Sequence, residues 1–131
     1  MKKNLIIIVI ILIIFTQIMA EKREIFVNKI NVKLLKVEYL EAVLVRPSFG
    51  IKKIAYIDYG QERKSLKKII VTDKKGVKIK FISLAEFLNE MYRNNWIYLE
   101  TYVDTKNKVY SNKNHMIFRR NYVKLHSIGE E

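Results

Sequence analysis

Alternating apolar and polar positions along the middle and the last third of the chain predict β-strands. Residues 37–46 alternate between two largely apolar faces. Pro47 ends this predicted strand, because proline has no amide hydrogen to donate to a sheet ladder. Asp73–Gly76 separates two short apolar runs and predicts a hairpin loop, in which glycine supplies a positive φ. The other predicted strands cover residues 53–59, 68–72, 77–81, 96–103 and 115–120.

A change to a 3.6-residue period predicts one helix over residues 84–93. Ser83 and Glu86 form a capping box, which satisfies two amide donors at the start of the helix. Four apolar side chains recur at the spacing of one helix face and are predicted to dock on the sheet: Leu84, Phe87, Leu88 and Met91. The side chains predicted to face away are Glu86, Asn89, Glu90 and Arg93. Asn94 and Asn95 are predicted to end the helix, because asparagine tolerates a left-handed conformation.

Together these elements predict an α+β fold. We expect an antiparallel β-sheet of about five to six strands, with the helix at about residues 84–93 packed on one face. A chain of 131 residues corresponds to one domain. We expect this single domain to cover residues 21–131, with an ordered core over about residues 37–120, and an N-terminal signal helix to precede it.

The first twenty residues have the pattern of a secretory signal peptide. Lys2 and Lys3 precede an unbroken apolar run over residues 5–15, and a more polar segment ends at Ala20, the predicted cleavage site. We therefore expect an exported protein that is periplasmic or secreted. The alternative is an uncleaved N-terminal anchor in the inner membrane, although a spanning helix needs about twenty apolar residues.

Composition excludes several kinds of chemistry. The chain has no cysteine, which excludes disulfides, a thiol nucleophile and cysteine-ligated metals. Half of the residues are apolar, so the bulk of the chain is not a disordered tail. The sequence has no phosphate-binding loop, no Gly-x-Ser-x-Gly elbow and no His-Glu-x-x-His motif. We therefore expect no cofactor and a non-catalytic function.

Positive charge is concentrated in one stretch of the chain. The formal net charge is +12, and residues 46–80 contain eleven basic residues against three acidic ones. The basic residues in this stretch are Arg46, Lys52, Lys53, Arg63, Lys64, Lys67, Lys68, Lys74, Lys75, Lys78 and Lys80. Such a surface can bind an anionic polymer, namely acidic polysaccharide, lipid headgroups or nucleic acid. The alternative is a merely lysine-rich composition, and nucleic acid is the least expected partner because phosphate recognition favours arginine.

Three aromatic residues form a second candidate site. Trp96, Tyr98 and Tyr102 fall on one face of the strand predicted over residues 96–103. An aromatic platform of this kind can stack on a sugar ring or a base. The alternative is that Trp96 fills the corner between helix and sheet and the two tyrosines pack over the sheet.

Two sets of titratable residues are candidates for chemistry. His115 and His126 are the only histidines and would need carboxylates from elsewhere to hold a metal, so we predict no metal site. Asp58, Glu62 and Glu100 lie near predicted strand ends and could form an acid–base pair. The alternative for these three acids is solvated surface charge.

The predicted helix and the strand after it carry a family resemblance. Residues 87–98 read FLNEMYRNNWIY, and residues 57–61 read IDYGQ. This part of the chain resembles small exported bacterial proteins of unknown function, in which a short helix leads through a Gly-Trp corner into a strand. Asn95 stands where that family has glycine, and Ile97 stands where it has glutamate. The resemblance covers about 80 residues and implies a fold and export, but no activity.

These observations lead to three functional hypotheses. The first is a small exported, non-catalytic domain that binds another protein or a surface polymer, with the membrane involved only through the signal segment. The second is a binder of an anionic polymer that uses residues 46–80. The third is a small carboxylate-based hydrolase, which requires two acids about 5–9 Å apart in a pocket.

Overall fold

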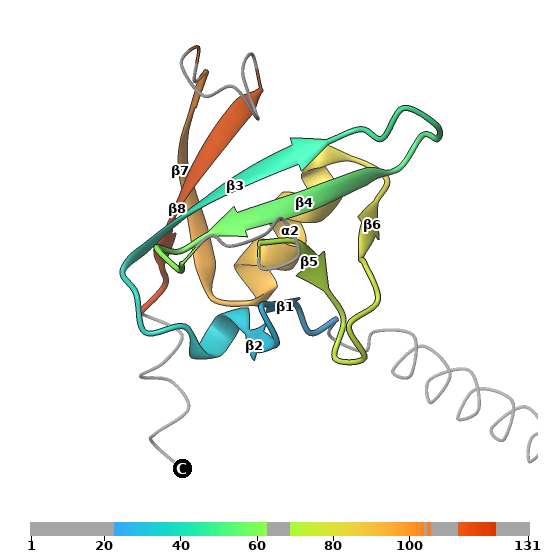
Figure 1. Cartoon of the computed structure of the whole chain (residues 1–131). Helices are drawn as coiled ribbons and strands as arrows, with labels where there is room; N and C mark the ends of the chain where they lie inside the picture. Colours follow the sequence, from blue (N-terminus) through green and yellow to red (C-terminus); the bar gives the residue numbers. More distant parts are fainter. Residues whose placement is uncertain (1–22, 63–68, 104, 106–112, 123–131) are drawn as a thin grey trace, which may run out of the picture.

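The computed structural model describes residues 23–62, 69–103, 105 and 113–122, and the predicted signal helix lies outside these ranges. The described residues form a mixed α+β structure with two antiparallel sheets and one α-helix. The larger sheet has five strands in the order β6-β4-β3-β8-β7 (Figure 1). Their bounds are β3 Tyr39–Val45, β4 Lys53–Asp58, β6 Lys80–Phe81, β7 Trp96–Val103 and β8 Asn114–Arg120. The α+β class and the antiparallel sheet with one helix are therefore confirmed.

The smaller sheet is a correction to the prediction of a single sheet. It has three strands in the order β2 (Ile30–Asn31), β1 (Phe26–Val27) and β5 (Val71–Thr72). A 3₁₀ helix, η1 (Val32–Leu34), follows β2. The sequence did not indicate this sheet, because its strands have two residues each and the pairing of β1 with β5 joins segments more than forty residues apart.

The core begins earlier in the chain than residue 37, where the ordered part was predicted to start. Ile25, Val27 and Val32 are all fully buried and belong to the main apolar cluster. The indole Nε1–H of Trp96 donates a hydrogen bond of 3.0 Å to the carbonyl oxygen of Val32. The N-terminal segment is thus a structural part of the domain.

The helix α2 (Leu84–Arg93) has the predicted bounds. The Ser83 hydroxyl accepts a hydrogen bond from the Glu86 amide at 3.1 Å, and the Glu86 carboxylate accepts one from the Ile82 amide at 2.6 Å. These bonds are close to the predicted capping box. At the other end, Asn95 has a φ of 69°, the left-handed conformation that is predicted for an asparagine at the end of this helix.

The buried face of α2 is rotated relative to the predicted one. Phe87 and Met91 are fully buried as predicted, but Leu84 is 45% exposed. Glu90, predicted to face solvent, is only 7% exposed and forms an ion pair with Arg93 at 2.7 Å. The rotation has a physical cause, because α2 also faces the N-terminal segment. The side-chain amide of Asn94 donates to the Arg23 carbonyl oxygen at 3.2 Å across that contact.

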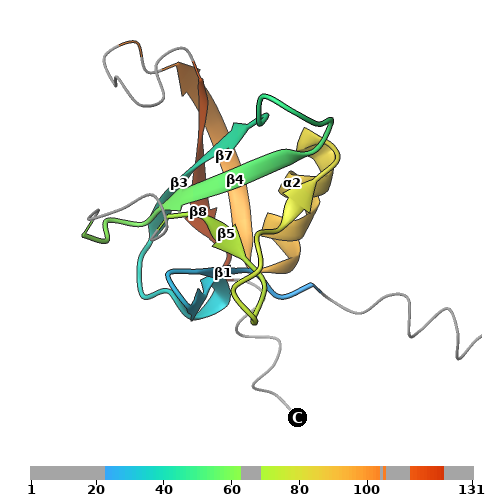
Figure 2. The same cartoon turned by 45° about the vertical axis from the view of Figure 1, so that its right-hand side comes forward.

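The core lies between α2 and one face of the larger sheet, with the smaller sheet near the lower end of the helix (Figure 2). The ring of Phe87 packs edge to face against Phe81 and Phe118, with centroids 5.1 and 5.9 Å apart. Edge-to-face pairs of this kind stabilise a core beyond their buried area. Non-covalent contacts therefore hold the domain together, because the chain has no cysteine to form a disulfide.

Candidate functional site

Seven of the eleven predicted basic residues lie within the described part of the chain. Arg46, Lys52 and Lys53 flank the β3–β4 loop. Lys78 and Lys80 lie in or beside β6, the outer strand of the larger sheet, and Lys74 and Lys75 lie in the turn between β5 and β6. We call these seven residues the basic edge. The remaining four, Arg63, Lys64, Lys67 and Lys68, lie outside the described residues.

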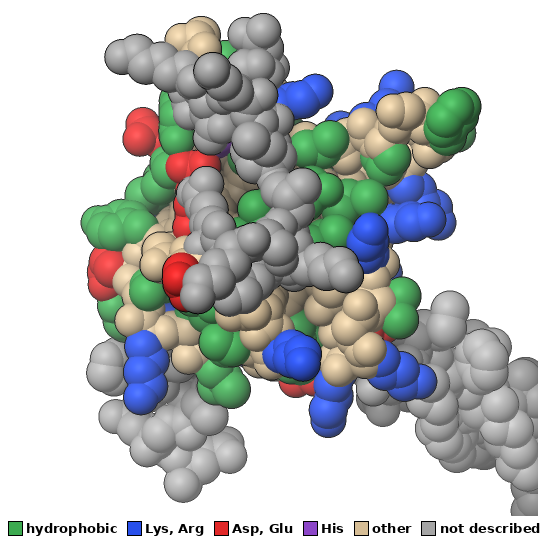
Figure 3. Space-filling view, in the orientation of Figure 1, with side chains coloured by type: hydrophobic (Ala, Val, Ile, Leu, Met, Phe, Trp, Pro, Cys, Tyr) green, Lys and Arg blue, Asp and Glu red, His purple; other side chains and the backbone are tan. Residues whose placement is uncertain are grey.

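The cations of the basic edge have no acidic partners among the described residues. Six of the seven are exposed, and Lys53 is half-buried. Other cations of the domain do form ion pairs, as Arg23 does with Glu86 at 3.2 Å. In the space-filling view, Lys and Arg side chains gather on the right-hand side, and most acidic side chains lie on the left (Figure 3). The charge of this edge is therefore available to an anionic ligand.

An exposed group of apolar side chains adjoins three of these cations. Phe49 and Ile51 in the β3–β4 loop are 95% and 75% exposed. Ile82 is 65% exposed and follows the last residue pair of the β4–β6 ladder, Lys53 with Phe81, which places it at the base of the same loop. We call Phe49, Ile51 and Ile82 the apolar tip. Hydrophobic side chains are seen at the end of this projecting loop, with basic side chains beside it (Figure 3).

The three predicted platform aromatics do not share one surface. Trp96 is fully buried, and Tyr98 packs edge to face on Phe118 with centroids 5.9 Å apart. The ladder between β7 and β8 shifts register between Tyr98 and Glu100. This bulge reverses the alternation of β7, so that Tyr102 is opposite His115 on the other face of the sheet. The predicted aromatic platform is therefore not assembled.

Tyr102 instead belongs to a polar cluster on the outer face of the sheet. The Tyr102 hydroxyl donates to Glu41 Oε2 at 2.7 Å, and Glu41 Oε1 lies 2.7 Å from His115 Nδ1. The Tyr102 ring stacks on the His115 ring at a centroid distance of 5.1 Å. A carboxylate beside an imidazole is a common acid–base arrangement. The ring of His115 is only 1% exposed, however, and we interpret the cluster as a link between β3, β8 and β7.

The predicted carboxylates are not brought together as a catalytic pair. Asp58 is in β4, where it pairs across the ladder with Glu41, and Glu100 is in β7. The strands β3 and β8 lie between β4 and β7, so the backbones of β4 and β7 are three strand spacings apart, or about 14 Å. Glu62 follows β4 in an exposed connection. An acid pair of glycosidase type requires a separation of about 5–9 Å.

The structure offers no metal site among the residues it describes. His126 lies outside those residues, so its distance from His115 is not defined. No group of three His, Asp or Glu side chains within the described ranges could hold an ion. The prediction of no metal site therefore rests on the sequence.

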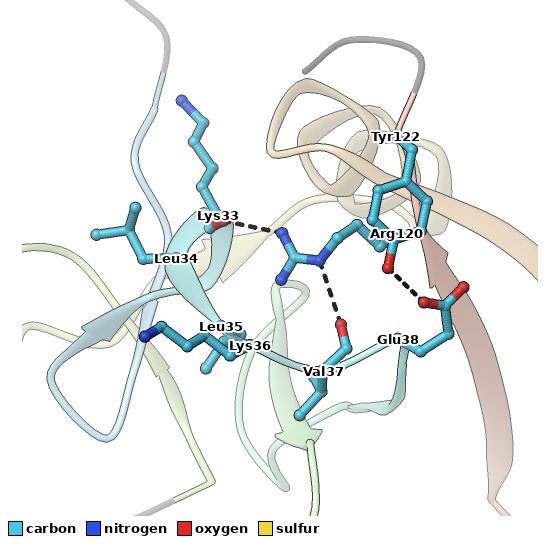
Figure 4. Close-up of a pocket in the computed structure, with 8 residues that line it drawn as sticks. All are labelled: Lys33, Leu34, Leu35, Lys36, Val37, Glu38, Arg120 and Tyr122. Carbon is cyan, nitrogen blue, oxygen red and sulfur yellow. Dashed lines mark hydrogen bonds between the residues drawn. The ribbon is translucent and has the colours of Figure 1, made fainter. Parts of the chain in front are cut away.

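An open depression of about 450 Å³ lies between η1 and the end of β8 (Figure 4). Its lining residues are Lys33, Leu34, Leu35, Lys36, Val37, Glu38, Arg120 and Tyr122. Arg120 Nε donates to the Val37 carbonyl oxygen at 3.2 Å, and Nη1 donates to the Lys33 carbonyl oxygen at 3.1 Å. The guanidinium carbon lies 4.7 Å from the centroid of the Trp96 ring. Arg120 therefore joins η1 and the chain after it to the sheet.

The chemistry of this depression is mixed. Arg120 is 8% exposed, and its Nη2 has no hydrogen-bond partner among the described residues. The Tyr122 hydroxyl donates to Glu38 Oε2, and this hydrogen bond raises the pKa of Tyr122 above its ordinary value. Because Arg120 Nη2 is itself buried, a ligand in the depression would not reach it without a rearrangement. We interpret Arg120 as a structural residue.

Sequence reasoning missed the apolar tip and the polar cluster for different reasons. Residues 48–51 follow the predicted strand over residues 37–46 and were assigned no functional role, although Phe49 and Ile51 alternate with small residues beside Lys52 and Lys53. That local signal could have identified the tip. The cluster joins Glu41 and His115, which are 74 positions apart, and no local pattern connects them.

Comparisons with known proteins return no relative. No family model matches the chain, and neither the curated proteins nor the solved structures contain a match. The resemblance to small exported bacterial proteins therefore stays a prediction. Among the described residues, no helix has the length and apolarity needed to cross a membrane.

Proposed function

We propose that this protein is an exported, non-catalytic binding domain whose ligand is a polyanionic surface or polymer. The observation that supports the proposal is the basic edge, where seven cations have no acidic partner in the described part of the chain. Unpaired cations on one edge create a positive potential that attracts and holds anions. The signal peptide pattern of residues 1–20 supports export.

A hydrolase is the less favoured alternative. The arrangement of Asp58 and Glu100 on strands separated by β3 and β8 does not suit a two-carboxylate mechanism. His115, the one described histidine, is buried in a cluster with Glu41 and Tyr102. The open depression beside η1 is lined mainly by lysine and aliphatic side chains together with Arg120. A binding role agrees better with these positions than a catalytic one.

Retention on immobilised heparin tests the proposal. We expect strong retention that weakens steeply with salt, because each contact between a cation and an anionic group releases a counterion. The double variant Lys52→Gln/Lys80→Gln removes two cations of the basic edge. It should elute at lower salt and reduce the slope of log affinity against log salt by about two.

A matched control separates position from net charge. Lys29 and Lys36 are exposed lysines outside the basic edge. The double variant Lys29→Gln/Lys36→Gln removes the same charge and should elute close to the parent protein. Equal losses in the two double variants would mean that only net charge matters, and the basic edge would then not be the binding surface.

A further inference from the structure

The β3–β4 loop combines features that a polyanion alone would not require. It projects from the end of the hairpin that β3 and β4 form (Figure 1). Phe49 at its end is 95% exposed, which is unusual for a phenylalanine in a folded domain. The residues around it include Arg46, Lys52 and Lys53, and no acidic residue occurs between positions 46 and 57.

From this arrangement we propose that the apolar tip inserts into the interface of an anionic lipid bilayer while the neighbouring cations bind lipid phosphates. The inference rests on the proposed function and specifies its ligand. Apolar side chains at the depth of the headgroups gain from leaving water, as aromatic side chains do at membrane interfaces. Lysine and arginine near an anionic leaflet add about fivefold in affinity per cation.

Shape favours a bilayer over a polymer chain as the occupant. Phe49 and Ile51 lie in the projecting β3–β4 loop and Ile82 lies at its base, so the apolar tip presents a convex surface (Figure 3). A single strand of nucleic acid is bound by stacking of its bases on aromatic rings along a basic groove. Phe49 is the one aromatic ring of the tip, and Ile51 and Ile82 offer no stacking surface. A plane of lipid, in contrast, accepts a convex apolar tip, and the long lysine side chains can reach the headgroups.

The position of the cations agrees with an orientation in which the β3–β4 loop points toward the bilayer. Lys80 pairs with Ile54 across the β4–β6 ladder, so it lies at the same end of the sheet as Lys52 and Lys53. Lys52 and Lys80 are exposed, and neither has an acidic partner among the described residues. When the tip meets the bilayer, these ammonium groups lie at the level of the lipid phosphates. The charge and the apolar group therefore act on the same surface.

A tryptophan at the tip provides a direct probe of insertion. The variant Phe49→Trp is expressed from the full-length sequence, and the protein is purified in whatever form the cells produce, with or without the leader. The native Trp96 is fully buried, so an environment-dependent change in fluorescence on adding vesicles reports on position 49. With phosphatidylcholine vesicles that contain phosphatidylglycerol, we expect a blue shift of the emission and protection from acrylamide. Pure phosphatidylcholine vesicles should give a much smaller change, because the cations then lack anionic partners.

Matched serine variants measure the contribution of the tip to vesicle binding. Phe49→Ser should lower partitioning to phosphatidylglycerol-containing vesicles about tenfold. Leu34 is 71% exposed on η1, away from the β3–β4 loop, and Leu34→Ser should change partitioning less than twofold. A leader that remained attached would bind vesicles in all variants, but it would not shift the emission of Trp at position 49.

The outcomes distinguish this inference from the proposed function. Unchanged emission at position 49 together with strong heparin retention would overturn lipid insertion and leave polyanion binding in place. The variant Phe49→Ser gives a second way to overturn the inference. If it lowers heparin retention as much as it lowers vesicle binding, the tip binds the polymer itself. Loss of both heparin and vesicle binding in the parent protein would overturn the proposed function.

Discussion

At the scale of single residues, Arg120 shows how one side chain joins segments that are distant in sequence. Its donors satisfy the carbonyl oxygens of Lys33 and Val37, and its guanidinium covers Trp96. A buried cation without a carboxylate is costly unless such contacts compensate it. The carbonyl bonds and the ring therefore explain why an arginine is accommodated at 8% exposure.

Substitution of Arg120 tests this role. Arg120→Ala leaves two carbonyl oxygens without their donors and removes the contact with Trp96, so we expect it to lower the free energy of unfolding by about 2 kcal/mol. Urea unfolding followed by fluorescence measures the change. Arg119, the exposed neighbour on the same strand, provides the control, and Arg119→Ala should change stability by less than about 0.5 kcal/mol. Similar losses in both variants would contradict the assigned role.

Residue-level predictions from sequence succeeded where the signal was local. The predicted alternation of residues 37–46 is seen in β3, where Leu40, Ala42 and Leu44 share one face and pair with Phe118, Met116 and Ala55 across the sheet. The grouping of Trp96, Tyr98 and Tyr102 failed because a bulge adds one residue to the alternation. A bulge depends on the partner strand, and nothing in the sequence of β7 alone indicates it.

At the scale of elements, α2 is the part of the fold that the sequence specifies most completely. Its start is determined by Ser83 and Glu86, its end by Asn94 and Asn95, and both signals lie within a few residues of the helix. The rotation of its buried face has a different origin. It depends on the N-terminal segment at Arg23, 71 positions from Asn94, so a helical-wheel pattern could not reveal it.

The cap at the start of α2 allows a quantitative test. Ser83→Ala removes the acceptor for the Glu86 amide and should lower the free energy of unfolding by about 1 kcal/mol. Ser83→Asp keeps an acceptor at this position and should retain most of the stability. Thermal or urea unfolding measures both. A Ser83→Asp variant as unstable as Ser83→Ala would show that the side-chain acceptor is not what stabilises the helix start.

At the scale of the whole molecule, the two sheets depend on the segment that precedes residue 37. Ile25, Val27 and Val32 are fully buried in the main core, and β1 links β2 to β5. Sequence pattern predicted the fold class, the helix and most strands of the larger sheet. It could not predict the strand order, because β8 inserts between β3 and β7 through pairings that join residues far apart.

A truncation tests the contribution of this segment. A chain that begins at residue 37 loses four buried side chains, Ile25, Val27, Val32 and Leu35, each of which stabilises the fold by about 2 kcal/mol, and this loss approaches the whole stability of a small domain. We expect it to lack a cooperative unfolding transition in circular dichroism. A chain that begins at residue 21 keeps the segment and should unfold cooperatively. Equal transitions for the two chains would show that residues 23–36 are dispensable.

The irregularity in β7 has a consequence for how copies of the molecule behave together. β7 is an outer strand of eight residues, and Leu99, Tyr102 and Val103 are each at least 40% exposed on it. A long, regular edge strand with exposed apolar side chains can pair with strands of other molecules and nucleate fibrils. The extra residue between Tyr98 and Glu100 breaks the even spacing of amide and carbonyl groups that a foreign strand would need. At high protein concentration, the edge of β7 is therefore poorly suited to pairing with a strand of another molecule. This favours separate molecules over fibrillar assembly.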